Sequence, residues 1–462
     1  MSSRPHSLMR VRLCSSRNAL ICCLLVTVLI ATILLGVGVS QDRAEDPTGK
    51  ARVIDTPVDN HVILISIDGF RADFWDRFDH PYLSYMAGRG VRVKQMRPVF
   101  PSKTFPNHWS IITGLLPETH GIVGNAFYAP DLGLNFSVKT SGSNGLFWGG
   151  MPLWSAAQLQ NVTSGCVFWP GSELPSTPER PAPAIALKYN GSLPNDARAL
   201  EAVRLMKQGI RFVTLYFSLV DETGHKFGVD GDAASAALQA AITSVDSAIR
   251  LLYTELRKAD IDPEVVVVAD HGMVSVSTER SISVESLLAT VSVPYMLVDM
   301  REPGDVAPLL SLYLTGNVTA ETARAVAAQL HHENARFFAR DDIPEQFRFR
   351  NNVRIPHVLG VADMAWVFKR DGQSKWPTLG AHGYNNSALE MQALCLAAGP
   401  TFQSNVTIDS CDNVDLVNML SKLLGITAPP NNGSTTLGGR MLRSNRFHFS
   451  NVTTTAASPP ST

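Results

Sequence analysis

The stretch that decides the fold is Val62-Ile63-Leu64-Ile65-Ser66-Ile67-Asp68-Gly69. Its first six residues lack the polar alternation of a half-exposed strand, and an acidic residue and a glycine end the run. Such a run of Val, Ile and Leu is typical of a strand that is buried on both faces of a parallel sheet. We therefore predict an α/β fold in which Asp68 stands at the carboxyl end of a central strand.

Two further runs repeat this pattern. Residues 212–220 (FVTLYFSLV) end in Asp221, and residues 265–269 (VVVVA) end in Asp270 and His271. Ligands of open α/β sheets collect outside the carboxyl ends of the strands, where these runs would meet. A single aspartate after a strand is more often a turn former. Three strands that each end in a metal-ligand residue type instead predict a shared site.

The residue types of this predicted site indicate a metal centre. Carboxylate oxygens and neutral imidazoles form the mixed ligand set of a catalytic zinc site. Two divalent ions about 4 Å apart can clamp both the attacking and the leaving oxygen of a phosphoryl displacement. The pattern therefore predicts a two-metal centre for phosphorus chemistry. The candidate ligands are Asp68, Asp221, His225, Asp270, His271 and His382.

Short motifs surround these candidate ligands along the chain. The longest is FPSKTFPNHWSIITGLLPETHGIVGN, from Phe100 to Asn125. The shorter ones are DGFR (68–71), FWPGS (168–172), YNGS (189–192), DETGH (221–225), DHGM (270–273) and HGY (382–384). In this order, over roughly residues 61–430, they resemble the nucleotide pyrophosphatase/phosphodiesterase family, ectonucleotide type, of the alkaline phosphatase superfamily.

The resemblance implies roles for individual residues. It implies two zinc ions, one held by Asp221, His225 and His382 and the other by Asp68, Asp270 and His271. Thr104 would bridge the ions as the nucleophile, and Asn125 and the backbone amide of Thr104 would stabilise the oxyanion. A threonine hydroxyl is a poor nucleophile at neutral pH unless a metal lowers its pKa. The expected reaction is hydrolysis of nucleotide phosphodiester or pyrophosphate bonds to nucleoside 5′-monophosphates through a covalent threonine intermediate.

The residues around the predicted centre indicate a nucleobase pocket. Phe105 follows the nucleophile, and the family places a base-stacking tyrosine where Tyr189 stands. Two aromatic faces can sandwich a base, and each stacking contact contributes ~1–3 kcal/mol. Trp169 and Glu173 lie in or beside the WPGS stretch and are further substrate-binding candidates. Lys103 is either a positive charge that serves the phosphate or a solvated lysine, and both interpretations stay open.

Two other functions remain as alternatives. A choline-phosphodiester or lysophospholipid phosphodiesterase would use the same metal centre, with aromatic faces attracting the ammonium and Glu173 as the neutralising acid. A catalytically silent recognition protein is the second alternative, and the intact set of Thr104, Asn125 and all six ligands argues against it. A phosphomonoesterase is disfavoured, because no phosphate-binding arginine stands beside Thr104.

Length and charge agree with one large catalytic unit. A chain of 462 residues that is 45% hydrophobic can bury a substantial core, and its formal net charge of −1 indicates no nucleic-acid-binding surface. The candidate ligands run from Asp68 to His382, so residues 61–430 are predicted as one catalytic domain. By resemblance, its fold is an alkaline-phosphatase-like, mostly parallel central sheet flanked by helices. Expected substrates are nucleotides of the ATP, dinucleotide or nucleotide-sugar type.

The two ends of the chain differ from this domain. Residues 19–39 carry no charge and are long enough to cross a hydrocarbon core, which takes about 20 residues. The arginines of residues 1–18 predict a cytosolic N-terminal segment, a transmembrane signal-anchor and, after a stalk at 40–60, an extracellular or lumenal domain of a single-pass type II membrane protein. A cleaved signal peptide, and so a secreted protein, stays open. Residues 431–462 predict a disordered tail.

Sequons and cysteines agree with a secretory-pathway protein. Among Cys166, Cys395 and Cys411, the pair Cys395–Cys411 is the expected disulfide. Eight sequons predict a glycoprotein, at Asn135, Asn161, Asn190, Asn317, Asn385, Asn405, Asn432 and Asn451.

Several local elements follow from periodicity. Apolar spacing predicts amphipathic helices at 233–258 and 413–424, the second ended by Gly425, and a helix that begins near Asn107. The Gly- and Pro-rich stretch 142–194 is predicted as an irregular insertion near the site. His108 and His120 are predicted as hydrogen-bonded structural residues rather than ligands.

Overall fold

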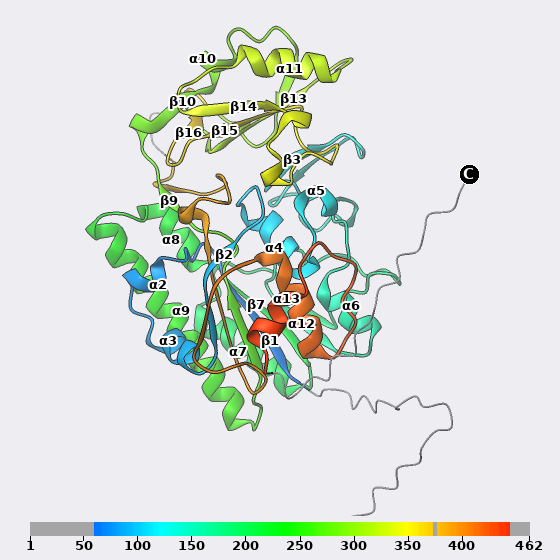
Figure 1. Cartoon of the computed structure of the whole chain (residues 1–462), viewed down its shortest axis with the longest axis vertical. Coiled ribbons are helices and arrows are strands. Elements are labelled where there is room, and N and C mark those ends of the chain that lie inside the picture. The colour runs from blue at the N-terminus through cyan, green and yellow to red at the C-terminus, as the bar shows by residue number, and fades with distance from the viewer. Residues whose placement is uncertain (1–59, 373–376, 444–462) are drawn as a thin grey trace, which may run out of the picture. The chain divides into compact units, whose positions relative to one another are not determined.

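The computed structural model describes residues 60–372 and 377–443. Its centre is an eight-stranded sheet in the order β19-β2-β18-β8-β1-β7-β5-β6 (Figure 1). These strands are β1 (Val62–Ile67), β2 (Val91–Arg97), β5 (Ser164–Val167), β6 (Ile185–Leu187), β7 (Phe212–Phe217), β8 (Glu264–Val268), β18 (Ala393–Ala398) and β19 (Val406–Asp412). β18 runs antiparallel to β2 and β8, and the other pairings are parallel. The predicted mostly parallel central sheet is confirmed.

Burial explains why the three predicted runs form the middle of this sheet. Every residue of β1, β7 and β8 is buried, and β1 lies between the other two in parallel register. Side chains on both faces of these strands meet helices, so no polar alternation is needed. The common direction brings the carboxyl ends of the three strands to one edge of the sheet.

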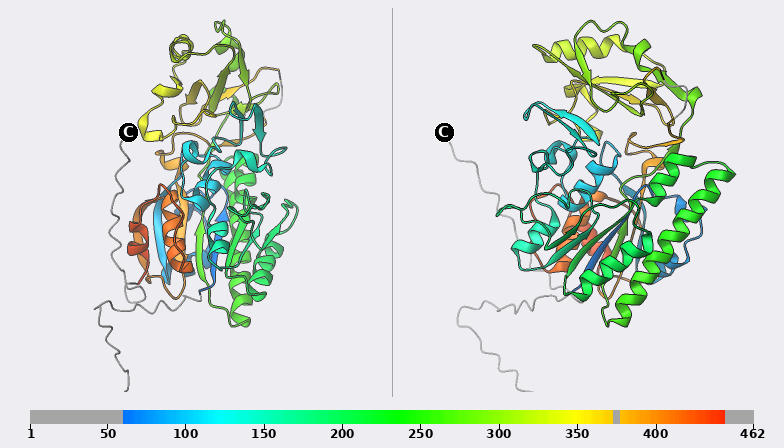
Figure 2. Two further views of the ribbon diagram at one scale, coloured as in Figure 1. Left: turned by 90° about the vertical axis from the view of Figure 1, so that its right-hand side faces the viewer. Right: turned by 180° about the vertical axis from the view of Figure 1, so that it is seen from behind.

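Helices cover both faces of the sheet. Figure 2 shows α7 (Asn195–Lys207) and α9 (Asp232–Lys258) on one face and α12 (Leu416–Leu424) and α13 (Thr436–Met441) on the other. α9 confirms the helix predicted at 233–258, and its apolar stripe is buried. α12 confirms most of the helix predicted at 413–424, with residues 413–415 forming a 3-10 turn before it. Gly425, with a φ of 67°, ends α12 in the left-handed conformation that glycine adopts readily.

A smaller layer is inserted between β9 (Val274–Ser275) and β17 (Gly380–Ala381). Its antiparallel sheet has the order β11-β13-β15-β14, and α11 packs against β14 and β15. Its elements are α10 (Val284–Leu288), β10 (Ser281–Ser283), β11 (Tyr295–Leu297), β12 (Val306–Ala307), β13 (Leu309–Leu314), α11 (Ala320–Gln329), β14 (Ala335–Ala339), β15 (Val358–Ala362) and β16 (Val367–Lys369). The inserted layer has an apolar core of its own, which the sequence analysis did not anticipate.

The remaining helices and strands lie between those already named along the chain. They are α2 (Phe74–Arg77), α3 (Pro81–Gly88), α4 (Thr104–Thr113), α5 (Pro117–His120), β3 (Ala126–Ala129), β4 (Leu134–Ser137), α6 (Leu153–Leu159) and α8 (Leu219–Phe227). None of the helices between residues 60 and 443 has the length and apolar character needed to cross a membrane. The predicted span at 19–39, nearly all of the stalk and Asn451 lie outside the described residues.

Three local predictions need correction. The strand predicted at 212–220 ends at Phe217, and Leu219 already begins α8. The helix predicted to start near Asn107 begins three residues earlier, at Thr104. The stretch 142–194 is not irregular throughout, because it contributes α6, β5 and β6, and the two strands extend the central sheet.

The predicted disulfide is wrong. Cys395 and Cys411 are both buried free thiols. Cys395 lies on β18 and Cys411 on β19, and β2 runs between these strands. Two strand spacings put the two Cα atoms roughly 9.5 Å apart, whereas a disulfide needs them within about 7 Å. The thiols are neighbours without being bonded, because contact with Cys395, together with burial, raises the pKa of Cys411 well above its usual value.

The ordered chain continues past residue 430, where the composition predicts a tail. The backbone N–H of Asn432 donates to the carbonyl of Gly114, and Leu437 and Met441 of α13 are buried in the main core. The packed region therefore extends to residue 443 in the described chain.

Candidate metal centre and adjoining pocket

The three predicted aspartates converge at the carboxyl edge of the central sheet. Asp68 follows β1, and Asp270 lies two residues after the end of β8. Asp221 lies in the first turn of α8, and this helix begins just after β7. Its Cα and Cβ lie 3.0 Å from the position that a Cβ on Gly69 would occupy, so the backbones approach closely there. Gly69 has a φ of +68°, which also favours glycine at that turn.

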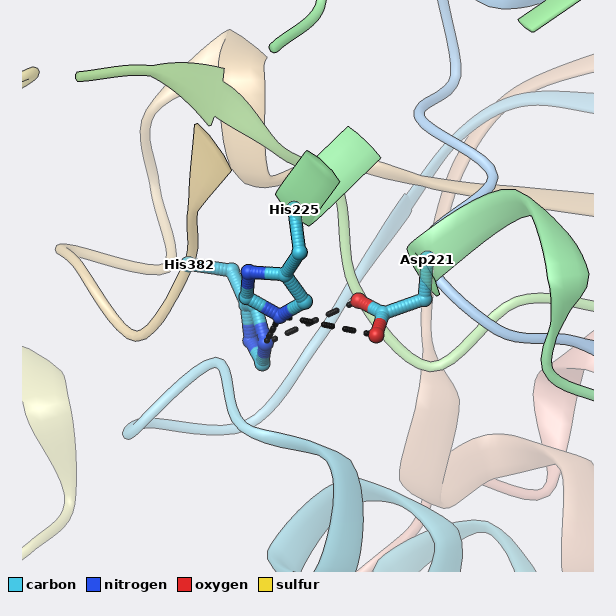
Figure 3. A group of neighbouring side chains, drawn as sticks. All are labelled: Asp221, His225 and His382. Atoms are coloured by element: carbon cyan, nitrogen blue, oxygen red, sulfur yellow. Dashed lines mark hydrogen bonds and ion pairs between the residues drawn. The ribbon is translucent and has the colours of Figure 1, made fainter. Parts of the chain in front are cut away.

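Asp221, His225 and His382 form the first group that could hold a metal ion (Figure 3). His225 stands one helical turn after Asp221 on α8, and His382 follows β17. The Nε2 atoms of His225 and His382 lie 3.2 Å apart, and the Asp221 carboxylate lies 3.5 Å from the first and 3.7 Å from the second. Three potential ligand atoms therefore face one another across a small space.

The other candidate ligands surround an adjacent point. His271 Nε2 lies 2.9 Å from Asp270 Oδ2 and 3.5 Å from Asp68 Oδ1. Asp221 joins Asp68 and His271 in a second group whose ligand atoms all lie within 4.8 Å of one another. The imidazoles of His271 and His382 stack with ring centroids 3.6 Å apart. All six predicted ligands thus come together in one cluster.

The orientation of the histidines suits metal binding. The Nδ1 atom of each candidate ligand histidine lies against a backbone carbonyl: Ser102 O for His382 at 2.9 Å, Gly380 O for His225 at 2.8 Å and Gly272 O for His271 at 2.9 Å. A proton on Nδ1 donates to that carbonyl and leaves the Nε2 lone pair toward the cluster. Metal-binding histidines are held in this way.

The carboxylates provide a second test of whether the cluster suits a metal ion. Asp68 Oδ1 and Asp221 Oδ1 are buried oxygens without a hydrogen-bond partner in the described structure, and Asp270 Oδ2 has an imidazole nitrogen, His271 Nε2, 2.9 Å away. Leaving a buried charged oxygen unpaired is costly. All three face the cluster, so the donor set fits divalent cations bound by carboxylate and imidazole, as zinc is.

Electrostatics favour the same conclusion. Burial and the neighbouring Asp270 and Asp221 raise the pKa of Asp68 well above its usual value, and burial raises the pKa of Asp221. Burial, followed by the nearby His271 and His225, lowers the pKa of His382 well below its usual value. The centre therefore concentrates negative charge beside a neutral imidazole, and a bound cation would relieve that repulsion.

Asp270 and His271 behave as a buried pair. Burial alone would raise the pKa of Asp270, but His271 and His108 outweigh burial and lower it. Burial alone would lower the pKa of His271, but Asp270 outweighs it and raises that pKa.

His108 and His120 make the hydrogen bonds expected of structural residues. His108 Nδ1 lies 2.9 Å from Thr104 O, and its Nε2 lies 2.8 Å from Ser66 Oγ. Asp68, His108 and Asp270 also satisfy the geometry of a metal-binding group, but both ring nitrogens of His108 are occupied by these contacts. His120 contacts Ser110 Oγ through Nε2, and burial lowers the pKa of its imidazole to about 3.

Thr104 lies at the start of α4, against the cluster. Its Oγ1 is 3.3 Å from His271 Nε2. Asn125 lies nearby, where its Oδ1 accepts a hydrogen bond of 3.0 Å from the backbone N–H of Phe105. That bond leaves the amide nitrogen of Asn125 as a donor beside the first turn of the helix. The N-terminus of α4 itself favours negative charge.

Lys103 is not a solvated surface lysine. Its side chain is 12% exposed, and its Nζ lies 3.9 Å from Asp299 Oδ2 in the inserted layer. Asp299 is 7% exposed and also accepts a hydrogen bond from Ser311 Oγ. The sequence analysis did not select Asp299, although it lies two residues after the end of β11, as Asp270 does after β8.

Four of the five predicted substrate residues line a cavity of about 580 Å³, and Lys103 does not. Phe105, Trp169, Glu173 and Tyr189 all contribute to its wall, as do Phe168, Tyr216 and Lys139, which the sequence analysis missed. Glu173 Oε1 accepts a hydrogen bond of 2.9 Å from the backbone N–H of Tyr189. The Tyr189 side chain is 47% exposed, so its ring is accessible from solvent.

Arg198 fixes one wall of this cavity. The side chain is buried, and its guanidinium donates to the carbonyls of Leu193, Gly191 and Tyr216. It also lies over the rings of Phe168 and Tyr189, 5.3 Å and 5.9 Å from their centroids. The loop that carries Tyr189 is thereby attached to the end of β7.

Comparison with known proteins agrees with this geometry. The family model described as type I phosphodiesterase / nucleotide pyrophosphatase matches residues 62–385. The bis(5′-adenosyl)-triphosphatase of Xenopus laevis is 32% identical over 398 residues, which cover 85% of this chain and 82% of that protein. Ectonucleotide pyrophosphatase/phosphodiesterase family member 1 of Mus musculus is 32% identical over 415 residues, which cover 86% of this chain and 45% of that protein. This chain therefore spans less than half of the mouse relative.

Solved structures share the fold. Murine ectonucleotide pyrophosphatase/phosphodiesterase 5 superimposes with a TM-score of 0.75 at 30% identity, covering 82% of this chain and 100% of that one. An inactive threonine-to-alanine variant of the same murine protein, in complex with AMP, gives a TM-score of 0.75 at 30% identity over 83% of this chain and 100% of that one. The chain belongs to the nucleotide pyrophosphatase/phosphodiesterase family of the alkaline phosphatase superfamily and is a phosphoric diester hydrolase.

Proposed function

We propose that this enzyme binds two zinc ions and hydrolyses nucleotide phosphodiester or pyrophosphate bonds to nucleoside 5′-monophosphates through a covalent intermediate on Thr104. One observation carries the proposal. Consecutive residues of α4 face two different features: Thr104 Oγ1 lies 3.3 Å from the candidate ligand His271, and the Phe105 ring lines the aromatic cavity. A phosphorus atom at the cluster would therefore place its nucleoside in that cavity.

The metal assignment is the one that the family resemblance implies, and the closeness of the six side chains supports it. Asp221, His225 and His382 would hold one ion, and Asp68, Asp270 and His271 the other. Bound zinc supplies charge stabilisation for the phosphoryl oxygens and a lower pKa for oxygens that it contacts. The carbonyl contacts of the three histidines keep Nε2 aimed at the cluster, so the ligand set is pre-oriented.

The chain's own groups account for the bond changes. The Thr104 oxygen bonds to phosphorus as the bond to the leaving oxygen breaks, and the hydroxyl proton passes to solvent. The leaving group departs in line, opposite Thr104. Water then attacks the same phosphorus, and the nucleoside monophosphate leaves as Thr104 recovers its proton. The amide nitrogen of Asn125 and the N–H groups of the first turn of α4 would stabilise the negative charge on phosphorus during both steps.

The cavity favours a nucleotide over a choline ester. Phe105 and Tyr189 supply aromatic faces for a base, whereas Glu173, the candidate partner for an ammonium, already accepts the N–H of Tyr189. Lys139 also lines the cavity and would repel a choline headgroup. The name of the Xenopus relative and the AMP complex of the murine one support nucleotide substrates, of the ATP, dinucleotide or nucleotide-sugar type.

We also propose that the protein acts outside the cytosol, anchored by residues 19–39 with its catalytic domain extracellular or lumenal. Relatives include mouse ectonucleotide and snake venom enzymes. The asparagines of six sequons are exposed, at Asn135, Asn161, Asn190, Asn317, Asn405 and Asn432. Glycosidase treatment of membrane-derived protein should lower its apparent mass by several glycans. An unchanged mass would contradict this placement.

The catalytic proposal is tested with two chromogenic diesters. Purified enzyme is assayed with the p-nitrophenyl ester of TMP and with p-nitrophenylphosphorylcholine at equal concentrations. We expect a higher kcat/KM for the TMP ester. A clear preference for the choline ester would replace the nucleotide function with a lipid-headgroup phosphodiesterase, and no turnover of either in the zinc-loaded enzyme would contradict both.

A further inference from the structure

A second cavity, of about 400 Å³, lies at the edge of the central sheet opposite the metal centre. Asp262, just before the start of β8, and Gly399, just after the end of the antiparallel β18, both line it. Asp68 and Asp270 stand at the other ends of β1 and β8. None of the residues lining this cavity lines the aromatic cavity beside Thr104. The second cavity therefore cannot be an extension of the catalytic pocket.

Positive charge converges on this second cavity. Arg89 follows α3, Arg257 lies in the last turn of α9, and Arg443 follows α13, yet all three line the same space. In the described part of the chain, no carboxylate lies within 4.0 Å of their guanidinium groups, whereas other arginines of this chain form such pairs. Asp262 is the acid on the wall. Three guanidiniums and one carboxylate line the cavity itself, so its lining is net positive, with the carboxylates of Glu264 and Asp246 behind the wall.

Tyrosine rings form the rest of the wall. Tyr82 lies between Tyr85 and Tyr253, with ring centroids 5.6 Å and 5.9 Å away. The Tyr85 side chain is 51% exposed, and the Arg89 guanidinium lies 5.6 Å from the centroid of its ring. Burial raises the pKa of Tyr253 to about 12, so this phenol adds no negative charge near neutral pH. The cavity thus combines aromatic faces with cations that have no acidic partner.

We propose that this cavity is a second ligand site that binds a nucleoside monophosphate, with the arginines around the phosphate and the tyrosine rings against the base. Guanidinium groups bind phosphate oxygens through charge-assisted, often bidentate hydrogen bonds. Tyrosine faces stack on any base. A volume of about 400 Å³ lies within the range of small-ligand sites. The proposal uses no residue of the metal centre and does not depend on the function proposed above.

Photoaffinity labelling distinguishes this site from the catalytic one. Full-length, zinc-loaded enzyme is irradiated with 8-azido-AMP, and the labelled peptides are identified by mass spectrometry. We expect label in peptides that contain Tyr82, Tyr85 or Tyr253, in addition to peptides from the Tyr189 cavity. Label confined to the catalytic cavity would overturn the proposal, because the reagent and the protein are the same for both sites.

A double variant, Arg89→Ala with Arg257→Ala, removes two of the cations. Labelling of the peptides that contain Tyr82, Tyr85 or Tyr253 should fall at least tenfold in this variant. Labelling of the catalytic cavity and kcat/KM should stay within twofold of wild type. Arg324→Ala, which removes an exposed arginine paired with Asp342, is the matched control and should change neither label. If the double variant does not fold, each single Arg→Gln variant provides the same comparison. Undiminished label in folded variants would overturn the assignment of the phosphate to these arginines.

A competition experiment distinguishes recognition of the phosphate from recognition of the base. Inorganic phosphate and AMP are each added, at equal concentrations, before irradiation. AMP should protect the tyrosine peptides at a concentration at least tenfold lower than phosphate does, because only AMP can stack on the rings. Equal protection would show that the cavity recognises phosphate alone and would overturn the nucleotide assignment.

Discussion

The hydroxyl of Tyr216 donates a hydrogen bond of 2.5 Å to Asp68 Oδ2, while the Tyr216 ring lines the aromatic cavity. The other carboxylate oxygen, Asp68 Oδ1, has no hydrogen-bond partner and lies 3.5 Å from His271 Nε2. Tyr216 therefore fixes which oxygen of Asp68 faces the metal cluster. Its ring centroid lies 6.3 Å from that of Tyr189, so one side chain contacts both the ligand set and the pocket wall.

Tyr216→Phe should weaken metal binding while preserving the shape of the cavity. The variant removes the hydroxyl that holds Asp68 and keeps the ring. Loss of such a supporting contact typically costs 10- to 100-fold in metal affinity or activity. Competition with a chelator measures the zinc affinity, and assays at saturating zinc give KM. We expect weaker zinc binding with KM for a nucleotide ester within about twofold of wild type. Unchanged zinc affinity would contradict the positioning role of Tyr216.

Thr104→Ala should abolish turnover and leave the fold and zinc content intact, whereas Thr104→Ser should keep measurable activity. The hydroxyl, rather than the bulk of the side chain, forms the bond to phosphorus. Loss of an essential nucleophile costs at least roughly a thousandfold in kcat. Steady-state kinetics and metal analysis of both variants provide the measurement. An alanine variant that retained more than a few per cent of kcat would remove Thr104 from the mechanism.

The sequence predicted the candidate ligands because each strand pattern ends near one. The strand ends indicated Asp68, Asp221, Asp270 and His271, the motifs that resemble the family added His225 and His382, and the structure brings all six together. Tyr216 was not predicted, because it lies inside a strand and not at its end. Every residue of β7 is buried, so no alternation distinguishes the position whose side chain reaches Asp68.

Other differences come from tertiary contacts that periodicity does not encode. Asn107 has the side chain of a helix cap, yet it lies inside α4 and binds loop backbone: its Oδ1 accepts from Val99 N and its Nδ2 donates to Pro101 O. Lys103 is the observed N-cap and makes no capping hydrogen bond with its side chain. The position of β2 between Cys395 and Cys411 depends on strand order, which spacing along the chain does not determine.

Chelation should inactivate the enzyme, and zinc should restore activity. We expect two zinc ions per chain by elemental analysis of the wild type. His382→Ala should lower both zinc content and rate, because an open catalytic site has no spare ligand. His331→Ala, which removes an exposed histidine of the inserted layer, is the matched control and should change neither. A fully active, metal-free preparation would rule out the metal centre.

Asp131→Asn should lower stability at neutral pH and have no effect at low pH. The hydrogen bond from Arg354, 2.8 Å between Nη2 and Oδ2, lowers the pKa of the Asp131 carboxyl. A carboxyl whose folded-state pKa is depressed stabilises the fold above its unfolded pKa, about 3.9, and loses that contribution as the pH falls through the folded value. Asp131 is partly exposed, so we expect a difference of at most about 1 kcal/mol. Denaturant midpoints of both proteins between pH 2.5 and pH 7 measure it, and a difference that persisted at the lowest pH would exclude this linkage.

Tyr189→Ala should lower kcat/KM for nucleotide substrates by roughly tenfold or more. Stacking of a base on an aromatic ring contributes ~1–3 kcal/mol, and ~1.4 kcal/mol corresponds to one decade in rate. The ring is 47% exposed and lines the cavity, so truncation removes a contact surface without opening the core. Kinetics with ATP and with the p-nitrophenyl ester of TMP measure the loss.

A small diester without a base is the control for this last variant. It reaches the same cluster and Thr104 but has nothing to stack on Tyr189, so its kcat/KM should barely change. Arg198 and Glu173 hold the backbone around Tyr189, and that support stays in place when the ring is removed. Equal losses on both substrates would mean that Tyr189 supports the structure of the site rather than the base, and would favour a substrate without a nucleoside.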